Sequence, residues 1–150
     1  MMTSRTSTTV AATRRLGQPY VATILAVAGA SMLAAGIWAG LAPRSFARFV
    51  DFPYHEHFLH DLGAFQIGIG VTLLVALAWR DAPTVALTGF LVANTLHAVS
   101  HAIDLDVGGR ASDLYAIGAL SLLSAAALVV RVRQRRTPAP VPASRQEEPR

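Results

Sequence analysis

Cysteine is absent from this chain, and so is lysine. Without cysteine, disulfide bridges, thiolate metal sites and cysteine nucleophiles are excluded, so any chemistry must use histidine, carboxylate or hydroxyl groups. Charged residues are also scarce, at 15% of 150 residues, whereas 53% of the residues are hydrophobic. A composition so poor in charge excludes an ordinary soluble domain and indicates that most of the chain lies in lipid.

Arginine supplies all of the positive side-chain charge, and the formal net charge is +4. A positive net charge would favour binding to nucleic acid. The arginines stand beside apolar runs, however, which is the pattern of membrane-topology signals. We therefore expect a lipid bilayer as the main partner and no nucleic acid.

Four segments are apolar enough to cross a bilayer, whose hydrocarbon core of about 30 Å needs about 20 helical residues. These segments are residues 20–42, 62–79, 84–102 and 112–130. The sequence predicts an all-α fold, namely an integral membrane four-helix bundle over residues 20–132.

The two ends of the chain are polar. Residues 1–19 are rich in Ser, Thr and Arg, and residues 133–150 are rich in Pro and Arg, so we expect disordered tails. Arginines gather beside both tails and at Arg80, whereas the loops 43–61 and 103–111 contain only three. The positive-inside rule then places both termini in the cytoplasm of a multi-pass protein of the plasma (inner) membrane.

The first outer loop contains an amphipathic stretch, "PRSFARFVDFP". Phe46, Phe49 and Val50 recur at helical spacing, and Arg44 and Arg48 lie four residues apart. This pattern predicts a short interfacial helix in the headgroup layer, ended by the second proline of the stretch.

Small residues recur in the predicted spans, and close approach through such residues is the usual way that helices associate in lipid. They are Gly29, Gly36 and Gly40 in the first span, Gly63, Gly68 and Gly70 in the second, and Gly118, Ser121 and Ser124 in the fourth. We interpret them as packing residues within the bundle; a homo-oligomer or a membrane-protein partner is the alternative.

The histidines are concentrated in one part of the chain, since all five fall between residues 55 and 101. On the third span, Asn94, His97, His101 and Asp104 follow the spacing of one helical face. The second span is preceded by a second group: His57, His60 and Asp61. A short turn joins these two spans, so we expect antiparallel neighbours whose polar groups meet at the outer rim, with Asp113 nearby.

Several functions fit such a cluster, and the residues alone leave them open. Zinc or another divalent ion accepts imidazole and carboxylate ligands, here from His57, His60, Asp61, His97, His101 and Asp104. Haem b could be held between the second and third spans by His60 and by His97 or His101. Proton relay or quinone chemistry is a third function, and hydrogen bonding that merely fixes the helix packing is a fourth.

The second span, "HDLGAFQIGIGVTLLVAL", together with the length and the four spans, resembles the DoxX-like superfamily of small bacterial four-helix membrane proteins. The resemblance covers Tyr20 to Val130 and implies an association with thiol or quinone redox systems and with membrane partners. It transfers no catalytic residue to this chain, and the absence of cysteine argues against direct thiol chemistry. A bias towards alanine, glycine and arginine is typical of a GC-rich bacterium.

Together these features predict a metal-binding or redox-accessory membrane protein rather than a free-standing enzyme. The alternatives are a structural, partner-binding subunit without ligand and a membrane oxidoreductase that uses haem or quinone.

Overall fold

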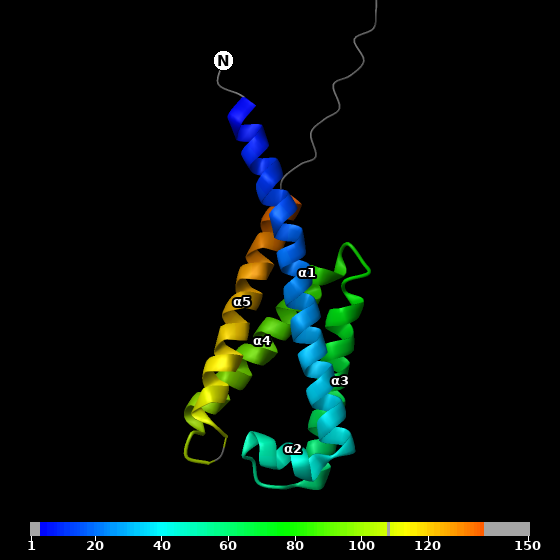
Figure 1. The fold of residues 1–150 in the computed structure, drawn as a ribbon, viewed down its shortest axis with the longest axis vertical. Helices are drawn as coiled ribbons and strands as arrows, with labels where there is room; N and C mark the ends of the chain where they lie inside the picture. Colours follow the sequence, from blue (N-terminus) through cyan, green and yellow to red (C-terminus); the bar gives the residue numbers. More distant parts are fainter. Residues whose placement is uncertain (1–3, 108, 137–150) are drawn as a thin grey trace, which may run out of the picture.

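The computed structural model describes residues 4–107 and 109–136, and the described chain is all-α. Its five helices are α1 (Ser4–Leu41), α2 (Pro43–Val50), α3 (Glu56–Val75), α4 (Ala82–Ile103) and α5 (Ala111–Arg136) (Figure 1). Four of them, all except α2, contain segments long and apolar enough to cross a membrane. The expectation of an all-α fold with four such helices is confirmed.

The helix ends differ from the predicted span ends, most clearly in α3. This helix begins at Glu56 and ends at Val75, whereas the hydrophobic run predicted 62–79. The early start has a local cause, because the backbone N–H of Phe58 donates a 3.2 Å hydrogen bond to Nδ1 of His55, which caps the helix. A polar first turn therefore belongs to α3, and the hydrophobic pattern alone could not locate it.

The remaining long helices extend beyond their predicted spans. α1 begins at Ser4, within the segment for which a disordered tail is expected, although its apolar part is Gln18–Leu41. α5 continues to Arg136. Once a helix is nucleated, each further residue adds a hydrogen bond, so polar residues can prolong an apolar helix. Residues 137–150 of the expected C-terminal tail lie outside the described residues.

The short helix α2 exists where the amphipathic stretch predicts it. It ends at Val50, before Pro53, because Asp51 adopts a left-handed conformation (φ 54°) and its N–H bonds to the Ala47 carbonyl. Phe46 and Ala47 are buried against α1 and α3. Part of its apolar side therefore covers the protein itself.

The long helices associate as two pairs, α1 with α3 and α4 with α5, whereas α3 and α4 touch only slightly. This arrangement corrects the expectation that the second and third spans pack closely as neighbours. The turn between α3 and α4 joins the two pairs at one end of the bundle (Figure 1). From there the pairs diverge towards α2.

Glycine forms the α1–α3 contact. A Cβ atom on Gly36 would lie 2.7 Å from the carbonyl oxygen of Gly63, and one on Gly70 would lie 2.8 Å from that of Gly29. The two glycines of each helix are seven residues apart and share one face, so the backbones meet twice without side chains between them. Gly40, by contrast, has open space where a Cβ would lie.

A buried amide connects α4 to α5. The Asn94 side chain is 4% exposed, and its Nδ2 donates hydrogen bonds to the Ile117 carbonyl (2.9 Å) and to Oγ of Ser121 (2.8 Å). Asn94 thus fixes helix packing, which is one of the functions considered for the polar stripe.

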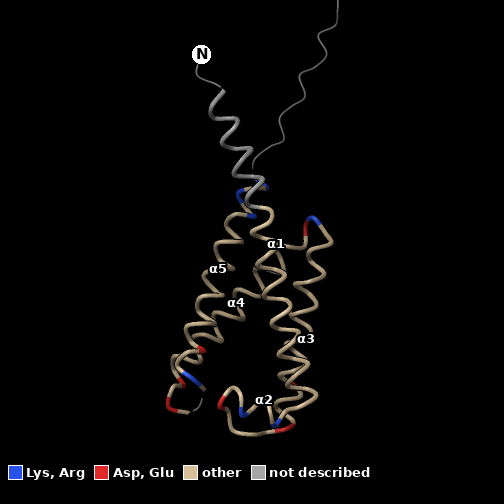
Figure 2. Tube along the Cα trace, viewed as in Figure 1, with Lys and Arg blue, Asp and Glu red and all other residues tan. Residues whose placement is uncertain are grey.

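The two ends of the bundle are packed differently. One end, here called the arginine end, contains Arg80, Arg131 and Arg135, and a core cluster from all four long helices lies towards it. At the other end, the α2 end, the core cluster contains residues of α1, α2 and α3 only. Among the described residues, the charged ones lie at these two ends, and none lies in the middle of the bundle (Figure 2).

Candidate functional site

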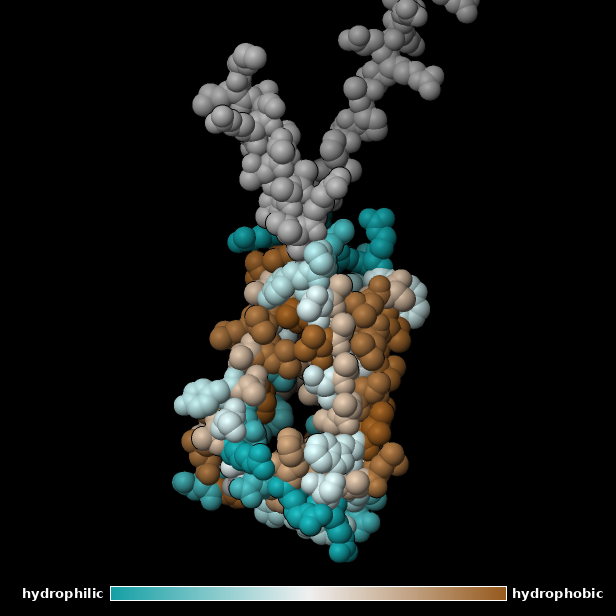
Figure 3. Space-filling view, viewed as in Figure 1, coloured by the Kyte–Doolittle hydropathy of each residue, from teal (hydrophilic) through white to brown (hydrophobic). Residues whose placement is uncertain are grey.

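A cavity of about 570 Å³ lies at the α2 end, between the two helix pairs. The space-filling view shows the molecule hollowed there (Figure 3). Residues from all five helices and from the loops beside α2 and α5 line it: Ala35, Trp38, Phe46, Phe49, Val50, Phe52, Phe58, Leu59, Leu62, Gln66, His97, Ser100, His101, Asp104, Gly109, Asp113, Ala116 and Ile117. This volume lies within the usual range of small-molecule sites, about 300–1,000 Å³.

The two sides of the cavity differ in chemistry. The side formed by α1, α2 and α3 is aromatic and aliphatic, with Gln66 as its polar residue in the described lining. The side formed by α4 and α5 contributes His97, Ser100, His101 and the two carboxylates of Asp104 and Asp113. A molecule in the cavity would meet an apolar wall on one side and hydrogen-bonding groups on the other.

The two histidines of α4 contact each other inside this cavity. Their Nε2 atoms are 3.1 Å apart, and four residues of helix bring the rings onto one face. In the neutral pair, the Nε2 of one ring carries a proton and donates the hydrogen bond, and the Nε2 of the other ring accepts it. The first ring therefore has an unprotonated Nδ1, which is an acceptor, and the second has a protonated Nδ1, which is a donor. The pair can therefore accept one hydrogen bond and donate another.

Gln66 provides an unpaired acceptor on the opposite side. Its Oε1 is buried, and no hydrogen-bond donor reaches it among the described residues. A buried carbonyl oxygen without a partner is unfavourable by about 1–3 kcal/mol. Gln66 lines the cavity, so a rotation of its amide would turn this oxygen towards a ligand donor, such as a hydroxyl group, and remove this penalty.

Gly109 and Arg110, which precede α5, contact the α2 segment at this end of the cavity. The Gly109 N–H donates a 2.9 Å hydrogen bond to the Asp51 carbonyl, and the Arg110 guanidinium lies 5.4 Å from the centre of the Phe49 ring. Gly109 has φ +86°, and a Cβ there would lie 3.2 Å from the His101 ring. These contacts connect the two helix pairs at the end where their long helices are apart.

The first histidine group of the sequence lies elsewhere. His57 and Asp61 form an exposed pair at 3.5 Å, and neither they nor His60 is among the described residues that line the cavity. On α3 the cavity is bordered by Phe58, Leu59, Leu62 and Gln66, and the last three share a helical face opposite that of the polar group. The expected meeting of the two groups at one rim therefore does not occur in the described chain.

This placement limits the metal and haem hypotheses. No group of three or more His, Asp or Glu side chains suited to a metal ion occurs among the described residues. The haem hypothesis needs an axial histidine from α3, and the described α3 residues at the cavity include none. His97, His101 and Asp104 share the cavity, whereas His57, His60 and Asp61 do not, and metal binding by any of the six stays a prediction.

Sequence reasoning did not identify the aromatic wall. Trp38 resembles an interfacial anchor, and its Nε1–H donates to Oγ of Ser45 on α2 at 2.6 Å. Phe46 and Phe49 were predicted to form the apolar side of an interfacial helix, and both line the cavity together with Trp38. The position of this wall depends on the α1–α3 contact, because Gly63 and Gly70 turn one face of α3 to α1 and leave the adjoining face to the cavity.

Comparison of the chain with protein families, with curated proteins and with solved structures finds no match. The resemblance to the DoxX-like superfamily stays a prediction, and the function is argued from the geometry of the site.

Proposed function

We propose that this chain is a multi-pass protein of a bacterial plasma membrane, with the arginine end in the cytoplasm and α2 in the outer headgroup layer. Large apolar side chains in the middle of the long helices support it, since Phe65, Val92 and Leu122 are 55–75% exposed. Such exposure is favourable in lipid and unfavourable in water. The arginines of α5, together with Arg80, supply the positive charge typical of a cytoplasmic side.

We further propose that the cavity at the α2 end binds a lipid-soluble molecule with an aromatic or acyl body and a hydroxyl head, the class that includes quinols. The observation that carries this proposal is the buried, unpaired Oε1 of Gln66 in a wall that is otherwise apolar. The aromatic side chains suit a planar or hydrocarbon body, and the His97–His101 pair offers a second polar contact to the head.

The test compares two probes that differ by one hydroxyl group, 4-nonylphenol and nonylbenzene. Each is titrated into detergent-purified protein, and the fluorescence of Trp38 is followed in the Trp79→Phe variant, because Trp38 lines this cavity and Trp79 does not. We expect 4-nonylphenol to bind about tenfold more tightly, the effect of one hydrogen bond to a buried acceptor. We expect Gln66→Leu to remove that difference.

Gln66 has a matched control in Gln134, which lies at the arginine end. The Gln134→Leu variant should keep the preference for the phenol. Equal affinity for both probes, or a preference that survives Gln66→Leu, would contradict the proposal.

A second candidate function is supported by one distance. The Nε2 atoms of His97 and His101 are 3.1 Å apart. Two imidazoles that bind one tetrahedral zinc ion, at about 2.0–2.1 Å each, have nitrogens about 3.3 Å apart. The pair would thus supply two ligands to a divalent ion, with water completing the shell.

Metal analysis of mildly purified protein tests this second candidate. Near-stoichiometric zinc or another divalent ion, lost in the His97→Ala, His101→Ala double variant, would support it. A metal content below about a tenth of an equivalent, in wild-type protein purified with zinc present and without a chelator, would contradict it.

A further inference from the structure

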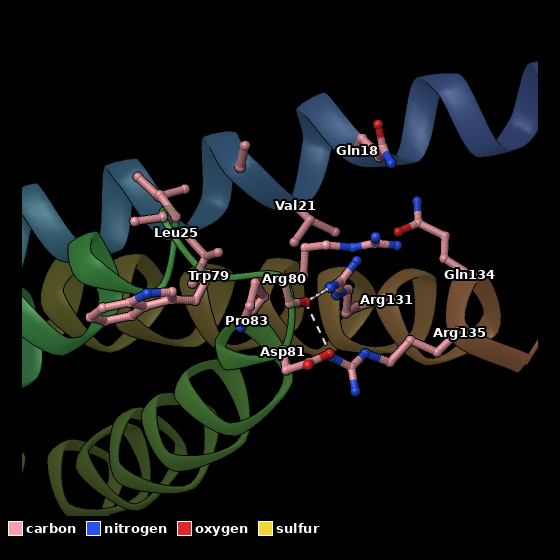
Figure 4. A pocket seen from close by; sticks show the side chains of 13 residues that line it. Gln18, Val21, Leu25, Trp79, Arg80, Asp81, Pro83, Arg131, Gln134 and Arg135 are labelled. Carbon is pink, nitrogen blue, oxygen red and sulfur yellow. Dashed lines mark hydrogen bonds and ion pairs between the residues drawn. The ribbon is translucent and has the colours of Figure 1, made fainter.

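A second cavity, of about 550 Å³, lies at the arginine end, between α1, α5 and the turn that joins α3 to α4 (Figure 4). Its described lining is Gln18, Val21, Ala22, Leu25, Leu77, Ala78, Trp79, Arg80, Asp81, Pro83, Arg131, Gln134 and Arg135. One part of this lining is apolar and the other is rich in guanidinium and amide groups. None of these residues belongs to the cavity at the α2 end.

The charge of this cavity is positive. Three arginines line it against one carboxylate in the described lining, that of Asp81. Arg135 forms an ion pair with Asp81, and both Arg131 and Arg135 donate to the Arg80 carbonyl (Figure 4). The Asp81 carboxylate can balance only one of the three guanidinium charges, so two positive charges remain for an anion.

Two residues of this lining carry hydrogen-bond donors that are buried behind its surface and unpaired. They are Nε of Arg131 and Nε2 of Gln134, and neither has an acceptor among the described residues. The side chains of Gln18, Arg80 and Gln134 point towards one another across the space between α1 and α5 (Figure 4). The lining thus combines excess positive charge with donors that lack an acceptor. An anion rich in acceptor oxygens would balance the charge, and it would accept these hydrogen bonds once the side chains of Arg131 and Gln134 turn towards it.

We propose that this cavity binds a phosphate group, carried by an anionic phospholipid of the membrane or present as free phosphate. Phosphate offers several acceptor oxygens, and guanidinium groups donate to it through paired N–H groups. The first turn of α4, which borders the cavity at Asp81 and Pro83, adds the positive end of a helix dipole. The apolar wall of Val21, Leu25 and Leu77 leaves room for an acyl chain beside the headgroup.

The proposal is tested on the full-length protein in neutral detergent, with Trp79 as the reporter in the Trp38→Phe variant, because Trp79 lines this cavity. The probes are dioctanoyl phosphatidylglycerol, dioctanoyl phosphatidylcholine and inorganic phosphate. We expect saturable binding of the anionic lipid, with an affinity at least about tenfold higher than that of the zwitterionic lipid. Saturation by inorganic phosphate at the same affinity would identify free phosphate as the ligand, and its failure to bind would identify the lipid headgroup.

Matched variants separate the site from general surface charge. Arg131→Gln should weaken binding about tenfold or more, as expected for loss of a charged donor to phosphate. Arg136→Gln removes the same charge on α5 outside the described lining, and it should change the affinity less than about twofold, as expected for a screened surface charge. Gln134→Leu, which removes a donor but no charge, should also weaken binding. It replaces Arg131→Gln as the test if the arginine variant does not fold.

The proposal is overturned if no anionic probe binds saturably, or if Arg136→Gln weakens binding as much as Arg131→Gln does. These results leave the cavity at the α2 end untouched, because the two cavities share no residue and each has its own tryptophan.

Discussion

The two helix pairs use different contacts. In α1–α3, Gly36 meets Gly63 and Gly29 meets Gly70, so the backbones touch directly. In α4–α5, the contact includes a buried amide, since Asn94 bonds to Ser121 and to the Ile117 carbonyl. Each pair thus has its own kind of contact. Between the pairs, α1 contacts α5, including a hydrogen bond from Tyr20 to the Leu123 carbonyl, whereas α3 and α4 share little contact. The pairs can therefore separate at the α2 end and leave a cavity with one apolar and one polar wall.

Breaking the glycine contact between α1 and α3 should lower the free energy of unfolding more than any other substitution considered below. A Cβ on Gly36 would lie within 3.0 Å of backbone atoms of α3, so Gly36→Ala forces the helices apart. We expect the free energy of unfolding to fall by about 1–3 kcal/mol, as for overpacked cores. Unfolding in mixed micelles with increasing SDS measures it.

Gly40→Ala is the control for this substitution, because the same methyl group on the same helix would enter open space. Its stability should be unchanged or raised by up to about 1 kcal/mol, since alanine favours helix over glycine. Equal losses in the two variants would show that α1 and α3 do not meet through their glycines.

Breaking the amide contact between α4 and α5 should lower the free energy of unfolding less than breaking the glycine contact does. Asn94→Leu removes two hydrogen bonds and leaves the Ile117 carbonyl and the Ser121 hydroxyl without the amide donor. We expect a loss of about 0.6–1.7 kcal/mol, the usual range for interhelical hydrogen bonds in membranes, in the same unfolding assay. Thr95→Val, at the exposed next position, is the control, and an equal effect of both variants would argue against the Asn94 contact.

The smallest change in the free energy of unfolding is expected for a substitution of Ser124 on α5. Its side chain is 0% exposed, and its hydroxyl has no hydrogen-bond partner among the described residues. Ser124→Ala should change the free energy of unfolding by less than about 0.5 kcal/mol or raise it, because an unpaired buried hydroxyl contributes no stability. A loss above about 1 kcal/mol would mean that this hydroxyl, like that of Ser121, connects the helices.

Much of the fold follows from local patterns in the sequence. Apolar runs predict the four long helices, and the spacing of Phe46, Phe49 and Val50 predicts α2. The pairing does not follow, because Gly36, Gly40 and Gly68 are equally small and only the partner helix distinguishes them. Gly36 is in backbone contact, whereas Gly40 and Gly68 have open space beside them.

The candidate site was predicted on one side only. The spacing of His97, His101 and Asp104 places them on one face of α4, and all three line the cavity. His57, His60 and Asp61 were expected to meet them, but the glycines of α3 direct another face of that helix towards α1 and the cavity. The rotation of α3 depends on contacts between distant residues, so spacing within one segment could not predict Gln66 as the polar group opposite the histidines.

The most direct test of the account is whether filling the cavity at the α2 end abolishes ligand binding. Ala116 of α5 lines this cavity, whereas Ala119, exposed on the same helix, is outside the described lining. The account predicts that Ala116→Phe abolishes saturable binding of 4-nonylphenol while Ala119→Phe binds it as the wild-type protein does. Undiminished binding by a folded Ala116→Phe variant would contradict it.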